Sequence, residues 1–412
     1  MVAAEEDVRL ELPVGALELR RYPRARREPL RAWDAADALL LDHVLQAPGV
    51  AEATGVPAGV DVGSGRVVVT DDRWGAVVTG LAAAGAAPVA VCDSVVSRAA
   101  VRANLARNGL AGSGVRLLPG TAGPEGPVDV LLLRLPRTLG LLQERLHRFA
   151  PALVAGARVV AAGMVPEVRS ATLRVFEELV GPTRTSLARR KARLVLAQPD
   201  PALVRPPAPW PVELVLQDAP GVLAGARVVQ HAGVFSAGGL DVGTRFFLEV
   251  LAARRPFAVG ERVLDVGCGN GVLGLAVARA QPGAVLTLVD DSDLALASAV
   301  ATFAVSAPAG VAVRFAAGDS AVADPGDGGA AQVAEGSVDV VLCNPPFHVH
   351  GSLTDSTAAR MVRDARRVLR PGGELWLVGN RHLAYHVLLR RVFGACEVVA
   401  GHPKFVVLRA VR

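Results

Sequence analysis

The segment RVLDVGCGNGVLGLAVARA, residues 262–280, decides the fold. Its first five residues predict a short apolar strand that carries Asp265, and residues 272–280 predict a helix. Glycines connect the two elements, because glycine adopts positive φ and lets backbone amides approach a ligand closely. The N-terminus of the following helix favours a carboxylate or a phosphate. We therefore expect a cofactor-binding loop formed by Asp265, Gly267, Cys268, Gly269, Asn270 and Gly271.

Strands and helices alternate around this loop, which is typical of an α/β fold with a mostly parallel sheet and helices on both faces. The expected strands are 262–266, 285–289, 311–316, 338–343 and 374–378, and the expected helices are 272–280, 294–306 and 357–369. The loop alone also fits a dinucleotide-binding fold or a simple tight turn. Its glycines are not spaced as in the GxGxxG dinucleotide fingerprint.

The first half of the chain repeats this order in weaker form. Its expected strands are 67–70, 88–92, 128–133 and 157–162, and its expected helices are 75–84, 99–108 and 139–149. Aligning VDVLLL (128–133) with VDVVLC (338–343), and Asp93 with Asp290, makes the halves look like a duplicated domain. Prolines crowd the segment 198–211, which predicts a stiff linker between domains 1–197 and 212–412.

Composition excludes several classes of protein. The chain has 412 residues, 51% of them hydrophobic, enough for two cores. No stretch approaches the roughly 20 uncharged apolar residues of a membrane span, and the acidic start is unlike a signal peptide, so we expect a cytosolic protein. The four cysteines lie far apart, which argues against a metal site and against disulfides.

The net positive charge of the chain lies entirely in its first half. Residues 1–197 hold 25 Lys and Arg against 20 Asp and Glu, a net charge of +5, whereas residues 198–412 hold 19 of each. The imbalance predicts an anionic partner that docks on the first domain. The run Arg189, Arg190 and Lys191 is our candidate for that contact.

Acidic residues follow the next two strands beyond the loop. Asp290 ends one strand about twenty residues after the glycines, where a carboxylate can accept hydrogen bonds from ribose hydroxyls. Of Asp291 and Asp293, one is expected to cap the next helix, and Asp291 is also a candidate cofactor contact. Asp319 ends the third strand, where it could bind an adenine amine or simply stabilise a turn.

The most specific element is Asn344-Pro345-Pro346-Phe347, directly after the strand 338–343. The lone pair of a base amine is delocalised, so methyl transfer requires the amine to be aimed in line at the methyl carbon. The side-chain carbonyl of Asn344 and the backbone carbonyl of Pro345 can each accept one N–H, and the prolines make the turn rigid. Phe347 could stack on a flipped base, with His348 beside it, or the whole motif could be a structural turn with Phe347 in the core.

Together VLDVGCGNGVLGL (263–275), Asp290 and VDVVLCNPPFH (338–348) resemble class I methyltransferases, specifically the rRNA guanine-N2 methyltransferases of the RsmC and RlmG type. The resemblance to the RlmG branch extends over nearly the whole chain, through the segments 33–41, 134–146, 175–194, 233–251, 379–400 and 403–411.

This resemblance implies two tandem Rossmann-like domains. The first is degenerate and helps to bind RNA, since Arg134-Leu135-Pro136-Arg137 replaces the Asn-Pro-Pro-Phe motif and TDDRWGA (70–76) replaces the glycine loop. The second is catalytic, and residues Phe235, Ser236, Leu240, Asp241, Gly243 and Thr244 are expected to cover its cofactor pocket.

The implied activity is methyl transfer from S-adenosylmethionine to the N2 of a guanine in rRNA, 23S rather than 16S. Ribosomal RNA or a ribosomal subunit precursor is the expected partner. Methylation of an adenine N6 or of a protein glutamine amide is the alternative activity, because the turn can present any planar NH2 group. An RNA-binding or assembly protein without turnover is the alternative from another class, and the intact glycine loop argues against it.

Overall fold

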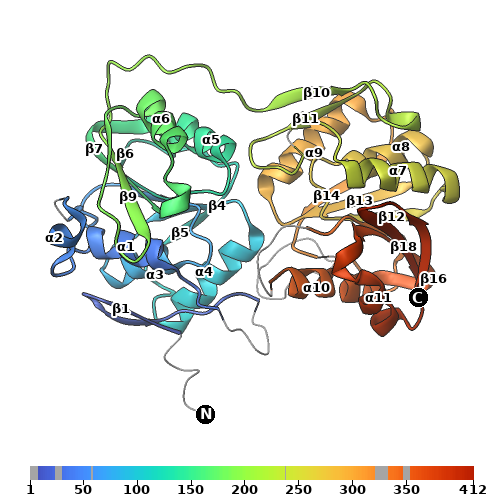
Figure 1. Cartoon of the computed structure of the whole chain (residues 1–412), viewed down its shortest axis with the longest axis horizontal. Coiled ribbons are helices and arrows are strands. Elements are labelled where there is room, and N and C mark those ends of the chain that lie inside the picture. The colour runs from blue at the N-terminus through green and yellow to red at the C-terminus, as the bar shows by residue number, and fades with distance from the viewer. Residues whose placement is uncertain (1–7, 24–29, 57–58, 237, 321–332, 347–352) are drawn as a thin grey trace, which may run out of the picture. The chain divides into compact units, whose positions relative to one another are not determined.

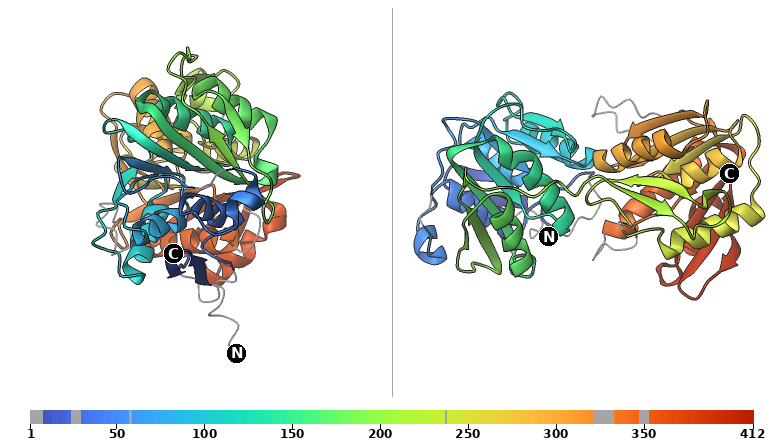
Figure 2. Two further views of the ribbon diagram at one scale, coloured as in Figure 1. Left: turned by 90° about the vertical axis from the view of Figure 1, so that its left-hand side faces the viewer. Right: turned by 90° about the horizontal axis from the view of Figure 1, so that it is seen from above.

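The computed structural model describes residues 8–23, 30–56, 59–236, 238–320, 333–346 and 353–412, with no side-chain detail for 353–356. The chain forms two compact units, unit 1 (Met1–Pro209) and unit 2 (Trp210–Arg412). Each unit contains a sheet covered by helices (Figure 1 and Figure 2). The boundary between the units falls within the proline-rich segment 198–211, none of which is helix or strand.

Unit 2 is built on a seven-stranded sheet in the order β14-β13-β12-β15-β16-β18-β17. The first five strands in this order are parallel, and β18 runs antiparallel to β16 and β17. The strands are β12 (Arg262–Val266), β13 (Val285–Asp290), β14 (Ala312–Ala317), β15 (Val338–Cys343), β16 (Leu369–Asn380), β17 (Glu397–Gly401) and β18 (Phe405–Val411). The helices are α7 (Val242–Arg254), α8 (Val272–Ala280), α9 (Asp293–Ser306), α10 (Leu353–Val368) and α11 (Tyr385–Phe393).

Alternate residues of these strands enter two hydrophobic cores, one on each face of the sheet. Val263 packs with α7, α8 and α9, whereas Leu264 packs with α10 and α11. Because side chains of a strand point alternately to opposite faces, an almost continuous apolar run is what a sheet buried on both sides requires. A separate hairpin of β10 (Val212–Leu216) and β11 (Ala226–Gln230) packs against α9 through backbone hydrogen bonds to its Ser and Thr hydroxyls.

The register of unit 2 brings three loops to one edge of its sheet. Val266 at the end of β12 lies opposite Val289 in β13 and Cys343 in β15. The chain therefore leaves all three strands at the same edge. The strand order reverses between β12 and β15, and the crevice at such a switch point is where α/β sheets bind their ligands.

Unit 1 repeats this topology, in the order β5-β4-β3-β6-β7-β9-β8. Its strands are β3 (Val67–Thr70), β4 (Val89–Cys92), β5 (Arg116–Pro119), β6 (Val128–Arg134), β7 (Leu153–Met164), β8 (Thr183–Thr185) and β9 (Ala192–Ala197). Its helices are α1 (Ala35–Val44), α2 (Val50–Thr54), α3 (Ala76–Ala83), α4 (Val95–Arg107), α5 (Leu139–Phe149) and α6 (Ser170–Leu179). A hairpin of β1 (Arg9–Leu12) and β2 (Gly15–Glu18) precedes them.

The two sheets can be compared strand by strand, because Thr70 pairs with Val91 and Leu133 as Val266 pairs with Val289 and Cys343. This register corrects the alignment of Asp93 with Asp290. Cys92 occupies the place of Asp290, and Asp93 occupies that of Asp291. The helix caps agree, since Ser94 and Ser292 each cap the following helix.

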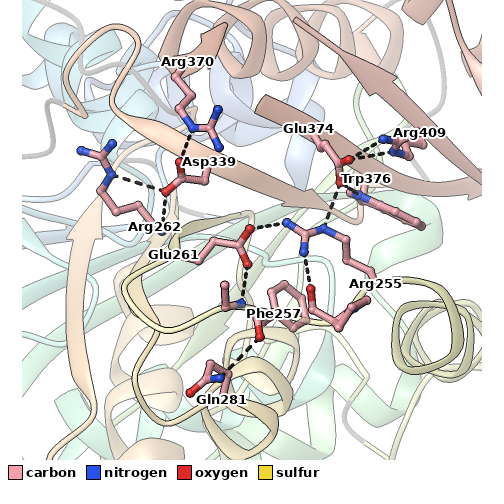
Figure 3. A network of polar contacts seen from close by, with 12 residues as sticks. Arg255, Phe257, Glu261, Arg262, Gln281, Asp339, Arg370, Glu374, Trp376 and Arg409 are labelled. Carbon is pink, nitrogen blue, oxygen red and sulfur yellow. Dashed lines mark hydrogen bonds and ion pairs between the residues drawn. The ribbon is translucent and has the colours of Figure 1, made fainter. Parts of the chain in front are cut away.

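In unit 2, a network of ion pairs stabilises the edge of the sheet where β12, β15 and β16 begin, opposite the edge where the three loops leave it (Figure 3). Glu374 in β16 accepts hydrogen bonds from Arg409 at 3.0 Å and from the indole of Trp376 at 2.8 Å, and it pairs with Arg255 at 2.9 Å. Asp339 pairs with Arg262 at 3.5 Å and also contacts Arg370, so it joins the starts of β12, β15 and β16. The candidate site lies at the other edge of the sheet, where β12, β13 and β15 end.

Candidate active site

The glycine loop between β12 and α8 has a backbone that requires glycine. Gly267, Gly269 and Gly271 all have positive φ, at 72°, 55° and 80°. A Cβ at Gly271 would lie 3.0 Å from that of Ala299, whereas a Cβ at Gly269 would meet no atom within 4 Å. The tip of the loop therefore faces open space, into which a side chain would intrude and a ligand can approach.

Two other loop residues are fixed by the protein itself. Cys268 packs in the core with 6% exposure, and its backbone amide donates to Val289 at 3.0 Å. The side chain of Asn270 donates to Gln230 at 3.2 Å. Burial raises the pKa of the Cys268 thiol well above its usual range, so this residue is a neutral core side chain.

Asp265 lies buried beneath this loop with 1% exposure. One of its oxygens accepts from the backbone amide of Gly274 at 3.2 Å, and the other has no partner within the described part of the chain. Burial, with a smaller effect of the Asp290 charge, raises the pKa of Asp265 to about 7. A buried carboxyl group with an unused oxygen fits a cationic or hydrogen-bond-donating ligand group.

Asp290 joins the end of β13 to the loop tip. Its carboxylate accepts from the backbone amide of Gly269 at 2.8 Å and from that of Ser292 at 2.9 Å. The cap of α9 is the hydroxyl of Ser292, so the expectation that Asp291 or Asp293 caps this helix was wrong. A serine hydroxyl serves because it can accept from the amide of Ala295, at 3.1 Å.

Asp319 follows β14 and forms an ion pair with Arg360 of α10 at 2.5 Å. Its carboxylate is thus already engaged by a cation. The structure places Asp319 at the same edge of the sheet as the loop, because β14 runs parallel to β13 and ends beside Asp290. Its role toward an adenine amine stays a prediction.

The side chain of Asn344 is held in one orientation. Its Nδ2 donates to the hydroxyl of Thr244 at 3.0 Å, and that hydroxyl donates in turn to Asp241 at 3.4 Å. Since the only hydroxyl proton of Thr244 goes to Asp241, its lone pairs are free to accept from the Asn344 amide. Asp241 is itself fixed as the N-cap of α7.

This arrangement leaves an acceptor for a substrate. The Oδ1 atom of Asn344 is buried and finds no hydrogen-bond partner among the residues that the structure describes. A buried unpaired acceptor costs free energy of about 1–3 kcal/mol, which a donor on a ligand would recover. Pro345 is buried and Pro346 exposed, whereas Phe347 and His348 lie outside the described residues.

Gln230 is a site residue that sequence reasoning missed. It is fully buried at the end of β11, where its Nε2 donates to the carbonyls of Val234 at 2.9 Å and Phe235 at 3.1 Å. Its Oε1 accepts from Asn270. Gln230 therefore connects the glycine loop to the backbone at Val234 and Phe235. The Phe235 residue itself is 52% exposed.

Unit 1 lacks the polar side chains of this site. By the shared register, Val69 replaces Asp265, Arg73 replaces Gly269, Cys92 replaces Asp290 and Arg134 replaces Asn344. Arg134 pairs with Asp37 at 2.6 Å and with Asp34 at 2.9 Å. An ion pair thus fills the place that the Asn344 amide and Thr244 occupy in unit 2.

The basic run of unit 1 lies in the turn between β8 and β9. Arg189 pairs with Asp42 at 2.7 Å. Arg190 and Lys191 are exposed and have positive φ, at 50° and 65°. Two of the three predicted cations therefore face solvent, and the third holds the turn against α1.

Within the described ranges, no group of three His, Cys, Asp or Glu side chains could hold a metal ion. No described helix combines the length and the apolar character that crossing a bilayer requires.

Two family models and several curated relatives match this chain. The family model of the RLMG N-terminal domain matches residues 7–201, and that of the methyltransferase small domain matches residues 225–409. The protein named ribosomal RNA large subunit methyltransferase G from Streptomyces griseus subsp. griseus is 52% identical over 97% of this chain and 98% of its own. Its namesakes from Streptomyces coelicolor and Ectopseudomonas mendocina are 53% and 44% identical, each over 97% of this chain and 99% and 98% of their own.

A solved structure shares the architecture along the whole chain. The 16S rRNA N2 methyltransferase RsmC of T. thermophilus, solved in complex with AdoMet and guanosine, matches with a TM-score of 0.70 at 26% identity. The match covers 99% of each chain. The expectation of two Rossmann-like domains and of a methyltransferase dependent on S-adenosylmethionine is confirmed. The chain belongs to the family of the ribosomal RNA large subunit methyltransferases G.

Proposed function

We propose that this protein transfers a methyl group from S-adenosylmethionine to the exocyclic N2 of a guanine in the 23S rRNA of the large ribosomal subunit. The relatives' names support the large subunit, and the guanosine bound to RsmC supports the base. The observation that carries the proposal is the buried Oδ1 of Asn344, which has no partner among the described residues. Thr244 holds this side chain at the same sheet edge as the glycine loop. The acceptor is therefore in place before the substrate binds.

The residues of unit 2 fit S-adenosylmethionine, which supplies an electrophilic methyl group on a sulfonium. The open space at Gly269 admits a ligand against the loop backbone. Asp290, fixed beside the loop tip, is suited to accept from ribose hydroxyls, with Asp291 next to it. The Asp265 oxygen that has no partner in the described ranges is suited to a cationic group. Asp319 and the backbone of Cys268 and Asn270 complete the proposed cofactor site.

The chemistry proposed for the chain's own residues is positional. Asn344 Oδ1 and the Pro345 carbonyl each accept one N–H of the base amine, which aims its lone pair and stabilises the positive charge that develops on it. The rigid turn at Pro346 keeps the two acceptors in place. Phe347 would stack on the extruded base with His348 at the rim, and the proton of the amine can leave to water after transfer.

Unit 1 is proposed to dock the RNA, since the net positive charge lies in residues 1–197 and its cofactor features are replaced. Arg189, Arg190 and Lys191 are candidates for phosphate contacts. Ribosomal RNA or a subunit precursor is then the partner, and the cytoplasm the compartment.

The test uses isotopically labelled S-adenosylmethionine with the full chain and unmodified 23S and 16S rRNA transcripts, and in parallel with assembled large subunits. We expect N2-methylguanosine in 23S rRNA. Label in N6-methyladenosine or in protein glutamine would replace the proposal by the corresponding alternative. Absence of S-adenosylmethionine binding by the purified protein would favour an assembly role without turnover.

A further inference from the structure

The loop of unit 1 that corresponds to the cofactor loop carries a cation and an aromatic ring in place of glycine and asparagine. Arg73 stands where unit 2 has Gly269, and Trp74 where it has Asn270. Positive φ is kept at two of the three loop positions, since Asp71 has φ of 62° and Gly75 has φ of 82°, as Gly267 and Gly271 have 72° and 80°, whereas Arg73 does not have the positive φ of Gly269. The same edge of the sheet is thus retained with different side chains.

A second exposed arginine comes from the turn after β6. Arg137 is the counterpart of Phe347 in the alignment of 128–137 with 338–347. Both arginines are exposed, and they come from the two loops that in unit 2 bind cofactor and substrate. Their positive charges act on each other, because the charge of Arg137 opposes ionisation of Arg73.

Trp74 contacts two arginines, and we call Arg73, Arg137 and Trp74 the cluster. The guanidinium groups of Arg73 and Arg21 lie over its ring, at 5.1 Å and 5.4 Å from the centroid. The backbone carbonyl of Trp74 accepts from the buried Asn104 at 2.8 Å, so the ring sits on a fixed support. Such cation–π contacts restrict the arginine side chains and lower the entropic cost of binding an anion.

The cluster has surplus positive charge. In the ranges that the structure describes, no carboxylate lies within ion-pair distance of Arg73 or Arg137. Asp34 raises the pKa of Arg73 slightly, but its carboxylate is paired with Arg134. Partial desolvation of this exposed side chain first, and then the charges of Arg137 and Arg21, lower the pKa of Arg73 to about 10. It is still charged at neutral pH and would gain from an anion beside it.

We propose that Arg73 and Arg137, with Trp74 as support, form a phosphate-binding site at the vestigial cofactor edge of unit 1, and that it binds the rRNA backbone. The inference rests on the proposed function, since it assumes an RNA substrate. It specifies that this edge, which lacks the residues of the proposed cofactor site, contacts phosphates through planar guanidinium groups that match phosphate oxygens.

The test measures binding of the full chain to an unmodified 23S rRNA transcript as salt is varied. The double variant Arg73→Gln, Arg137→Gln should bind about tenfold more weakly or worse near physiological salt, and its slope of log K against log salt should fall by roughly 1.4–1.8 for two lost phosphate contacts. The charge-matched control is Arg158→Gln, Arg174→Gln, which changes two exposed arginines of β7 and α6. The control should keep the wild-type slope.

S-adenosylmethionine affinity and the thermal unfolding midpoint should not change in either variant, which separates lost docking from misfolding. A wild-type slope in the Arg73, Arg137 variant would overturn this inference while leaving the proposed function intact. A wild-type protein that methylates no RNA would instead refute the proposed function. An equal loss of slope in the control would also overturn the inference, because the effect would then be general charge.

Discussion

The Nδ2 atom of Asn344 donates to the Thr244 hydroxyl at 3.0 Å across 100 positions of sequence, and the equivalent pair in unit 1 is Arg134 with Asp37 at 2.6 Å. Asp37 lies three residues after the α1 cap Asp34, as Thr244 lies three residues after the α7 cap Asp241. Both partners differ between the units. Among the described residues, a neutral hydrogen bond leaves Asn344 Oδ1 without a partner in unit 2, whereas in unit 1 the carboxylates of Asp34 and Asp37 accept from Arg134 and from backbone amides.

Removing the proposed acceptor should impair turnover rather than cofactor binding. For Asn344→Ala we expect kcat to fall about a hundredfold, the effect of losing one positioned polar group. The affinity for S-adenosylmethionine, measured by calorimetry, should stay near that of the wild type. A variant with normal turnover would refute the role of Asn344.

The orientation of Asn344 by Thr244 can be tested separately. Thr244→Val removes the hydroxyl that accepts from Nδ2, so we expect kcat to fall about tenfold, as for one hydrogen bond of roughly 1.4 kcal/mol. Thr244→Ser keeps the hydroxyl and should retain most of the activity. If the valine and serine variants show the same kcat, the hydroxyl does not position Asn344.

Asp290 should act through the cofactor. Asp290→Ala removes the acceptor for the amides of Gly269 and Ser292 and the carboxylate proposed to bind ribose, so affinity for S-adenosylmethionine should weaken about tenfold or more. Asp290→Asn keeps an acceptor for the loop and should lose less. Unchanged affinity in the alanine variant by calorimetry would contradict the assignment.

Asp265 makes the stability of unit 2 depend on pH. Its pKa rises from 3.8 in the unfolded chain to about 7 on folding, because the charged form is desolvated. The folded state then holds the proton more tightly, so the contribution of Asp265 to stability is greatest below pH 3.8 and is lost as pH rises toward 7. Asp265→Asn removes this dependence. The unfolding midpoints of both proteins should be measured at pH 5 and pH 8, and the midpoint of the variant relative to the wild type should rise with pH. The other buried carboxyl groups are present in both proteins, so their effects cancel in the comparison.

The strands and the glycine loop could be predicted from sequence because their signals are local. Arg262–Val266, Val272–Ala280 and Val338–Cys343 begin and end where the apolar runs and glycines predict. The antiparallel strands β17 and β18 were missed, since the pairing of short apolar runs depends on tertiary packing. The Asn344–Thr244 contact and the hydrogen bonds of Gln230 are set by tertiary packing, which no local pattern encodes.

Reversing the charge of Arg189, Arg190 and Lys191 should weaken RNA binding and flatten its salt dependence. Because Arg189 also pairs with Asp42, the change at that position breaks an ion pair within unit 1. Reversal of Arg190 and Lys191 alone is therefore the cleaner variant, and it should show most of the change in slope. A salt slope equal to that of the wild type would exclude this turn from the RNA contact.

Glu374 should stabilise unit 2 far from the site. Burial favours its neutral form, but hydrogen bonds from Arg409 and Trp376 and the charge of Arg255 outweigh burial and lower its pKa. Glu374→Gln should lower the free energy of unfolding by about 1–2 kcal/mol, less than the loss of a fully buried pair. The side chains of Arg255, Glu374 and Arg409 are 14–33% exposed, so solvent screens their charges, and Arg255 retains its ion pair with Glu261.

The control for that variant is Glu397→Gln, which removes the other partner of Arg409 at a site 56% exposed and should cost less than about 0.5 kcal/mol. Because the folded pKa of Glu374 is lowered, its contribution is present above the ordinary pKa of 4.5 and is lost as pH falls through the folded value. The unfolding midpoints of wild type and Glu374→Gln should therefore converge in acid. A gap that does not narrow as the pH falls below 4.5 would mean that packing, rather than charge, accounts for the loss.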